Sequence, residues 1–249
     1  MFGIPFSFYV AGFWLGTLEL FVLALVVLAV HVCYGAVVLE TKESHRLPGY
    51  ARMYMGDGGA TLASISAFFG MSGTLLAYII LGGVFLYGLL GSLITASSPA
   101  LWSVIFVIAG SGITFFSLKK EVLINSILTA FLIGCILVLI FVLMPHISPM
   151  YVVGFHATNA FVPFGVLLFA LSGATVIPDI MGFLKVGRFA HVRRVITLGS
   201  LIPAFLYFFF ALAVVGASGA QVSPDAIAGL MPVAGRTIVM LGNIIGLLA

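Results

Sequence analysis

Long runs of apolar residues constrain this chain more than any other feature. From Met1 to Leu39 the sequence carries a single charged side chain, that of Glu19. A helix needs about 20 apolar residues to cross the hydrocarbon core of a bilayer, so this stretch is almost twice as long as one crossing requires. Over the whole chain 63% of the residues are hydrophobic and 7% are charged, against roughly 25% charged residues in a soluble domain. The sequence therefore predicts an all-α integral membrane protein.

Glycine, proline and charged clusters divide the apolar sequence into about seven to eight helices. We expect a break near Gly12 to Gly16, between the outer half of a first span and a complete second one. The segment 40–57 is expected to be aqueous and the segment 119–121 to form a tight charged turn. The third span is long enough that it should tilt strongly or bend at Gly82-Gly83. The expected spans are 1–12, 13–39, 59–93, 101–118, 122–144, 160–184, 195–217 and 236–249.

Basic residues are distributed unevenly over the predicted connections. If the connections alternate between the two sides, only Arg236 lies apart from the other lysines and arginines, which are Lys42, Arg46, Arg52, Lys119, Lys120, Lys185, Arg188, Arg193 and Arg194. Short cytoplasmic loops carry an excess of basic residues. The side that holds these nine lysines and arginines is therefore assigned to the cytoplasm, and the first span crosses outward. The protein is expected in the cell membrane, surrounded by lipid. The basic residues are interpreted as orientation signals, and no nucleic-acid partner is expected.

Two of the apolar spans are interrupted by glycine and proline. One interruption lies at Gly3 and Pro5, and the other lies at Ser172-Gly173, shortly before Pro178. Membrane helices keep unpaired backbone at depth only where it lines a protein-enclosed cavity or binds a solute. Two such breaks, each followed by spans in a similar order, indicate a secondary transporter. The alternative is that the small residues after Leu171 form a packing face for a neighbouring helix.

The interrupted spans carry motifs that resemble a known family. The run from Gly3 to Phe13, GIPFSFYVAGF, resembles the first broken helix of the amino acid/auxin permease and aromatic amino acid permease group, within the amino acid-polyamine-organocation superfamily. The run from Pro163 to Asp179, PFGVLLFALSGATVIPD, is similar to the sixth helix of that group. The similarity covers essentially the whole chain in the order of its spans and the polarity of its connections.

This resemblance implies the leucine-transporter fold, which is built from two inverted five-helix repeats. Residues 1–249 would then be a single transmembrane transporter domain. Its first repeat would occupy 1–144, without the start of helix one, and a partial second repeat would occupy 160–249. We accordingly expect a piece of a longer permease, truncated at both ends.

The implied activity is secondary active transport of an amino acid by alternating access around the two broken helices. One alternative is a transporter of another small organic solute or of an ion. Another is a membrane subunit without transport activity, or a channel, although the rings of polar pore residues typical of channels are not apparent. Nothing in the sequence resembles a hydrolase triad or a dinucleotide fingerprint, and we do not expect an enzyme.

A free amino acid brings a carboxylate and an ammonium group, and both need partners when they leave water. At a broken helix, exposed N–H groups hold the anion and unpaired carbonyls hold the cation. Tyr78, in the middle of the third span, either closes over the carboxylate of the substrate or hydrogen-bonds another helix. The expected substrate-binding residues are Gly3, Ile4, Pro5, Tyr78, Phe169, Ala170, Leu171, Ser172, Gly173 and Ala174.

Two acidic residues, Glu19 and Asp179, lie within apolar spans. An ionisable group at such depth is a candidate for function, so both are candidates for proton coupling, with a structural role as the alternative. The coupling ion is either H+ or Na+, and no other cofactor, catalytic residue or metal site is expected. His31 is expected to hydrogen-bond a neighbour. Cys33 and Cys135 are expected to be buried free thiols.

Overall fold

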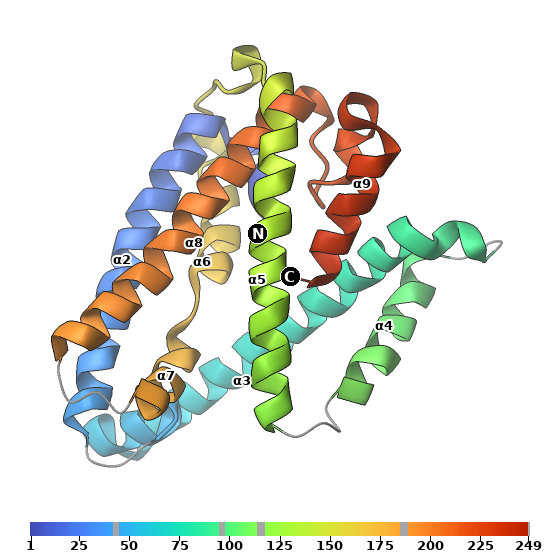
Figure 1. Ribbon diagram of the computed structural model, residues 1–249. Coiled ribbons are helices and arrows are strands. Elements are labelled where there is room, and N and C mark those ends of the chain that lie inside the picture. Colours follow the sequence, from blue (N-terminus) through green and yellow to red (C-terminus); the bar gives the residue numbers. More distant parts are fainter. Residues whose placement is uncertain (42–44, 95–97, 114–117, 185–188, 249) are drawn as a thin grey trace.

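The computed structural model describes residues 1–41, 45–94, 98–113, 118–184 and 189–248 as a bundle of helices (Figure 1). Short 3-10 turns follow α5 and precede α6, α7 and α9, and no strand occurs among the residues described. The prediction of an all-α protein is therefore confirmed. The helices are α1 (Gly3–Ala11), α2 (Phe13–Glu40), α3 (Leu47–Leu90), α4 (Pro99–Ile113), α5 (Leu118–Leu143), α6 (Phe161–Leu171), α7 (Ile177–Leu184), α8 (Phe189–Ser218) and α9 (Met231–Leu248).

Membrane-spanning length is reached by six segments of the part that is described, and α4 is a shorter apolar helix. The end of α2 and the starts of α5 and α8 lie at the lower end of Figure 1, whereas the end of α5 and the start of α6 lie at the upper end. The chain therefore alternates between two ends, as the charge argument assumes. The lower end is called the cytoplasmic end below, because the basic residues of the connections lie there.

The predicted boundary between the first two spans is confirmed. α1 ends at Ala11 and α2 begins at Phe13, and Gly12 between them has a φ of 93°. This left-handed backbone is readily adopted only by glycine. Gly12 therefore separates two helices that would otherwise form one continuous apolar run.

Part of the segment expected to be aqueous, 40–57, is helical, because α3 begins at Leu47 and is interrupted only at Gly56, whose φ is 72°. Three other expectations are wrong. Residues 119–121 belong to α5 and form no turn. α8 begins at Phe189, several residues before the expected start of that span. Cys33 lies on an exposed face of α2, although Cys135 is buried as expected.

Of the two alternatives for the third span, a strong tilt or a bend at Gly82-Gly83, the bend does not occur, because the backbone of α3 is helical there. Both glycines are buried instead, and a Cβ atom built on Gly82 would lie 2.7 Å from the ring of Phe106 on α4. Small residues let two membrane helices approach closely. The glycine pair therefore serves the packing of α3 against α4, and α3 crosses the molecule obliquely (Figure 1).

One helix, α8, takes part in every apolar cluster of the core. Val192 and Ile196 near its start pack with α2 and α7. Ala204 and Ala211 belong to the cluster around α1, α2 and α6, and Phe210 belongs to the cluster that includes α5 and α9. Since α8 is shared by all three clusters, it provides a common support for the broken segments around it.

Candidate functional site

The predicted break in the sixth span is confirmed. α6 ends at Leu171, Ser172 has extended backbone with a ψ of 120°, and α7 begins at Ile177. Between them Ala174–Val176 forms a single 3-10 turn. Pro178 lies in the first turn of α7, where its missing N–H costs no hydrogen bond. The sequence thus ends one helix and starts another inside a single apolar span.

The break leaves backbone donors without partners. The amide of Ser172 donates to the Phe169 carbonyl at 3.4 Å, and the amide of Val176 donates to the Gly173 carbonyl at 3.2 Å. The N–H groups of residues 173–175 have no hydrogen-bond partner within the described part of the chain. Unpaired amides at the start of a helix attract an anion. The break therefore offers a place for a carboxylate.

Three aromatic side chains from three helices gather around the end of α6. The rings of Tyr78 on α3 and Phe169 on α6 meet edge to face, with centroids 6.5 Å apart. Tyr207 on α8 donates its hydroxyl to the Ala170 carbonyl at 3.2 Å. Tyr78 and Phe169 are both partly exposed, at 49% and 44%, so their rings are available to a further aromatic group.

Tyr207 is not among the residues predicted for the site. The only sequence feature that marks Tyr207 is its position, since this tyrosine directly precedes the apolar run Phe208–Phe210. A tyrosine buried in such a run usually finds a hydrogen-bond partner. The sequence alone does not name that partner, because it depends on which face of α8 meets α6.

The predicted residues of α1 lie beside α6. A Cβ atom built on Gly3 would lie 3.3 Å from Cγ1 of Val166, about one helical turn before Ala170. Ile4 and Pro5 are buried in the core, and the amide of Ile4 donates to the Met1 carbonyl at 3.0 Å. The structure thus brings the start of α1 close to the end of α6, as a site shared by two broken helices requires.

His31 on α2 reaches the break from the opposite side. Its buried ring places Nδ1 3.3 Å from Oγ of Ser200 on α8. The expected hydrogen bond of His31 to a neighbour is therefore confirmed. A Cβ atom built on Gly173 would lie 3.6 Å from Cε1 of His31, so the imidazole faces the break across the space that a side chain on Gly173 would fill.

The two intramembrane acids lie apart. Asp179 is exposed in the first turn of α7. Glu19 lies in the second turn of α2, and its Oε2 atom is buried without a hydrogen-bond partner within the described chain. Glu19 is about 18 Å along α2 from His31, so it belongs to the outer part of the bundle and not to the Ser172-Gly173 break.

The break at Gly12 is closed by the loop between α5 and α6. The amide of His156 donates to the Ala11 carbonyl at 2.8 Å, and Nδ2 of Asn159 donates to the Val10 carbonyl at 3.0 Å. A Cβ atom built on Gly12 would lie 2.5 Å from the backbone carbon of Gly154. The loop therefore takes up carbonyls that the end of α1 leaves unpaired.

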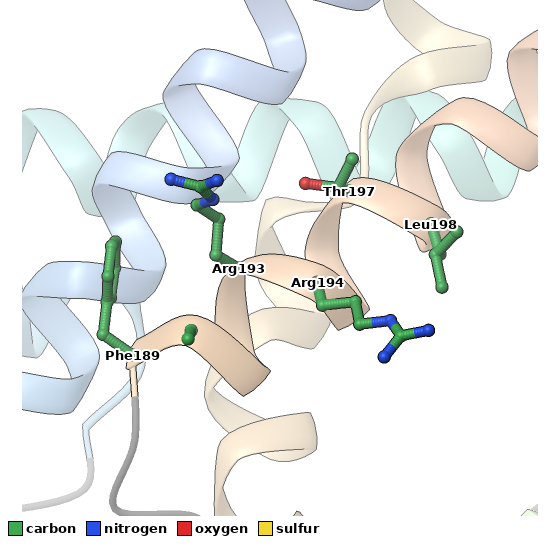
Figure 2. Close-up of a pocket in the computed structure, with 6 residues that line it drawn as sticks. Phe189, Arg193, Arg194, Thr197 and Leu198 are labelled. Carbon is green, nitrogen blue, oxygen red and sulfur yellow. The ribbon is translucent and has the colours of Figure 1, made fainter.

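A separate open cavity of about 430 Å³ lies at the start of α8 (Figure 2). Figure 2 shows Arg193 turned toward α2 and Arg194 turned away from it. None of the predicted substrate-binding residues lines this cavity, whose walls are formed by Phe189, Ala190, Arg193, Arg194, Thr197 and Leu198. It places two cationic side chains at the cytoplasmic end of the bundle.

Comparison with known proteins adds a family to this geometry. The sequence profile of the tryptophan/tyrosine permease family matches residues 1–229. None of the curated proteins and none of the solved structures matches the chain. The family match covers most of the chain and includes both broken segments, the aromatic cluster and all of α8. The chain belongs to the tryptophan/tyrosine permease family and is thereby an amino acid permease, a multi-pass protein of the cell membrane.

Proposed function

We propose that this permease carries an aromatic amino acid across the membrane and binds it at the break between α6 and α7. The observation that carries the proposal is the set of unpaired amides at residues 173–175 next to the Tyr78–Phe169 ring pair. One part of this arrangement suits a carboxylate and the other suits an aromatic ring. Both parts of an aromatic amino acid thus find a matching group within one site.

The backbone of the break binds the charged ends of the substrate. The free N–H groups after Ser172 hold the carboxylate, supported by the positive end of the α7 dipole. Carbonyls in the last turn of α6, which have no amide partner further along the helix, hold the ammonium group. Gly3 at the start of α1 faces α6 a turn away and completes the site from the second broken helix.

The substrate ring packs against the rings of Tyr78 and Phe169. An edge-to-face aromatic pair is worth about 0.5–1.5 kcal/mol beyond the burial of its surface. That gain corresponds to a preference of about two- to tenfold over an aliphatic side chain of similar area. The ring pair accordingly favours aromatic amino acids, while the backbone of the break treats all amino acids alike.

Transport proceeds by alternating access within a leucine-transporter fold. The half-helices α1 and α7 move against the longer helices α3 and α8, and the breaks supply the hinges. A gradient of H+ drives accumulation, with Glu19 and Asp179 as the acids available for coupling. A sodium gradient is the alternative driving force.

Uptake by the full protein in proteoliposomes tests this function. Labelled tryptophan, tyrosine and phenylalanine are expected to accumulate, and leucine is expected to accumulate less. The variant Tyr207→Phe removes the hydroxyl that holds the partly buried Ala170 carbonyl in place at the end of α6, and such a hydrogen bond contributes about 0.5–1.5 kcal/mol. We therefore expect its KM for tryptophan to rise about two- to tenfold.

Tyr9→Phe is the matched control, because Tyr9 is partly exposed and no hydrogen bond of its hydroxyl occurs among the described residues. Its KM should equal that of the parent protein. Equal uptake of leucine and tryptophan would contradict the aromatic preference. An unchanged KM in Tyr207→Phe would move the substrate away from the end of α6.

A further inference from the structure

Three helices converge tightly in the cytoplasmic half of the bundle. A Cβ atom built on Gly35 of α2 would lie 2.5 Å from Cδ1 of Ile196 on α8 and 3.9 Å from Cγ2 of Ile177 on α7. Both isoleucines are buried, together with Val38 and Val192, in one apolar cluster. The missing side chain of Gly35 therefore lets α7 and α8 close together onto α2.

His31 precedes Gly35 by one turn of α2. The residues that face His31 likewise lie about one turn away from the residues of α8 and α7 that face Gly35. Ser200, which faces Nδ1 of His31, follows Ile196 by one turn of α8. Gly173, whose missing side chain would contact Cε1, precedes Ile177 by a similar distance along the chain. The imidazole thus lies between α8 and the break, at the point where α7 separates from α6.

An imidazole at this place is suited to respond to protons. Histidine is the side chain whose ordinary pKa places its change of charge between about pH 5 and 8. A neutral ring shares one hydrogen bond with the Ser200 hydroxyl through Nδ1 and carries no charge that needs a partner. An imidazolium ion carries two N–H donors and a charge, and burying it with a single hydroxyl is costly.

The charged and titratable groups around His31 do not compensate such a charge. On α8, Arg193 and Tyr207 lie about two turns on either side of Ser200, and on α7 the nearest acid is the exposed Asp179. α6 has no titratable side chain, and the nearest such groups along α2 are Cys33, on an exposed face, and Tyr34. No ion pair joins His31 to a carboxylate in the described ranges.

We propose that His31 is a positioning residue that keeps the inner half-helix closed while its imidazole is neutral, and that protonation opens the junction of α2, α7 and α8. This inference rests on the proposed function, because it describes the inner gate of that substrate site. Neutral His31 bridges Ser200 and Gly173 and holds α7 against α2. Protonated His31 favours the state in which water enters beside Gly173.

The accessibility of a cysteine in the junction tests the gate without measuring transport. Val38→Cys, introduced with Cys33→Ala and Cys135→Ala, places a thiol in the buried cluster with little change of volume. The rate of its modification by a water-soluble thiol reagent is measured from pH 5.5 to 8 in the full protein. The same series with His31→Gln gives the reference, because the intrinsic pH dependence of the thiol is common to both and cancels in the ratio.

The ratio of the two rates is expected to rise as the pH falls, by up to about tenfold per pH unit while the group titrates. His191→Gln is the control, since His191 is exposed at the start of α8, and it should keep the parent profile. Ser200→Ala removes the partner of the neutral ring and should make labelling fast at high pH as well.

A parent-like profile in His31→Gln, or in His31→Asn if the glutamine variant does not fold, overturns the inference. Should neither variant fold, an unchanged profile in Ser200→Ala overturns it. Failure of aromatic amino acid uptake with a normal labelling response would reject the proposed substrate and leave the gate intact. Normal uptake with a flat labelling ratio would reject the gate alone.

Discussion

The helix breaks at Gly12, between the first two spans, and at Ser172-Gly173, inside the sixth span, have different surroundings. At Gly12, the loop between α5 and α6 donates hydrogen bonds to the carbonyls of Val10 and Ala11, and Gly154 presses against the backbone. At Ser172-Gly173, three consecutive amides have no partner in the described part of the protein. The first break is a closed corner between two helices, and the second has backbone left for a ligand.

These surroundings decide how a glycine in a long apolar run of sequence is interpreted. A break whose backbone groups are taken up by the protein is a turn, whatever its depth. A break whose groups remain unpaired requires water or a solute to satisfy them. Glycine in the sequence marks both kinds of break, and the hydrogen-bond partners decide between them.

Replacing Gly12 should have the largest effect on stability. Gly12→Ala forces a side chain into the left-handed region, at a cost of about 1–2 kcal/mol. It also pushes a Cβ atom to 2.5 Å from the Gly154 backbone, and overpacking of this kind adds about 1–3 kcal/mol. We expect a loss of about 3 kcal/mol, seen as a clear fall in the melting temperature of the purified protein.

Gly165→Ala is the control, because a Cβ atom at Gly165 on α6 meets no atom within 4 Å. That variant should be as stable as the parent or slightly more stable. If Gly12→Ala melts with the parent, the loop does not hold the first break closed, and the contrast between the two breaks disappears.

Both breaks could be predicted from the sequence because glycine and proline interrupt apolar runs that are too long for one helix. The same signal made a bend at Gly82-Gly83 one of two alternatives, but there the glycines serve close packing against Phe106 and the backbone stays helical. The prediction of a turn failed at 119–121, because charged residues at a membrane boundary are compatible with the first turns of a helix. Local composition does not distinguish a bend from a packing surface.

The partners of the second break could not be predicted. Ser200 and Tyr207 lie on α8, a continuous helix of 30 residues whose long apolar stretch offers little periodicity from which to read its inner face. Which residues of α8 meet α2 and α6 depends on the packing of helices that are distant in the sequence. The residues of α6 could be predicted from local sequence signals alone. The residues of α8 that contact them can be identified only from the tertiary structure.

Replacing Gly173 should affect transport more than stability. Its φ of −150° is open to any residue, and a Cβ atom would be in ordinary contact with His31 at 3.6 Å. The larger side chain of Gly173→Leu occupies the place proposed for the substrate. Extra methylenes in a fitted site cost about 1–3 kcal/mol, so kcat/KM for tryptophan should fall about tenfold or more at nearly unchanged melting temperature.

Gly165→Leu adds the same side chain to α6 where it meets open space, and it should transport normally. Equal transport by the two leucine variants would favour the alternative that the small residues after Leu171 are a packing face. A large loss of stability in Gly173→Leu would show that the second break is as closed as the first.

The smallest expected effect separates the two acids by the break to which each belongs. Asp179 lies in the first turn of α7, where an acidic residue stabilises the helix start by about 0.3–1 kcal/mol. Glu19 lies on α2 near the closed Gly12 break. With an inside-alkaline gradient and no sodium, Asp179→Asn should reduce accumulation of tryptophan about two- to fivefold, and Glu19→Gln should leave it unchanged. The measurement is steady-state accumulation in proteoliposomes at equal protein content. A larger loss in Glu19→Gln than in Asp179→Asn would place coupling at the outer end of α2, near the closed Gly12 break. Accumulation that requires a sodium gradient and does not respond to the proton gradient would show that neither acid takes part in coupling.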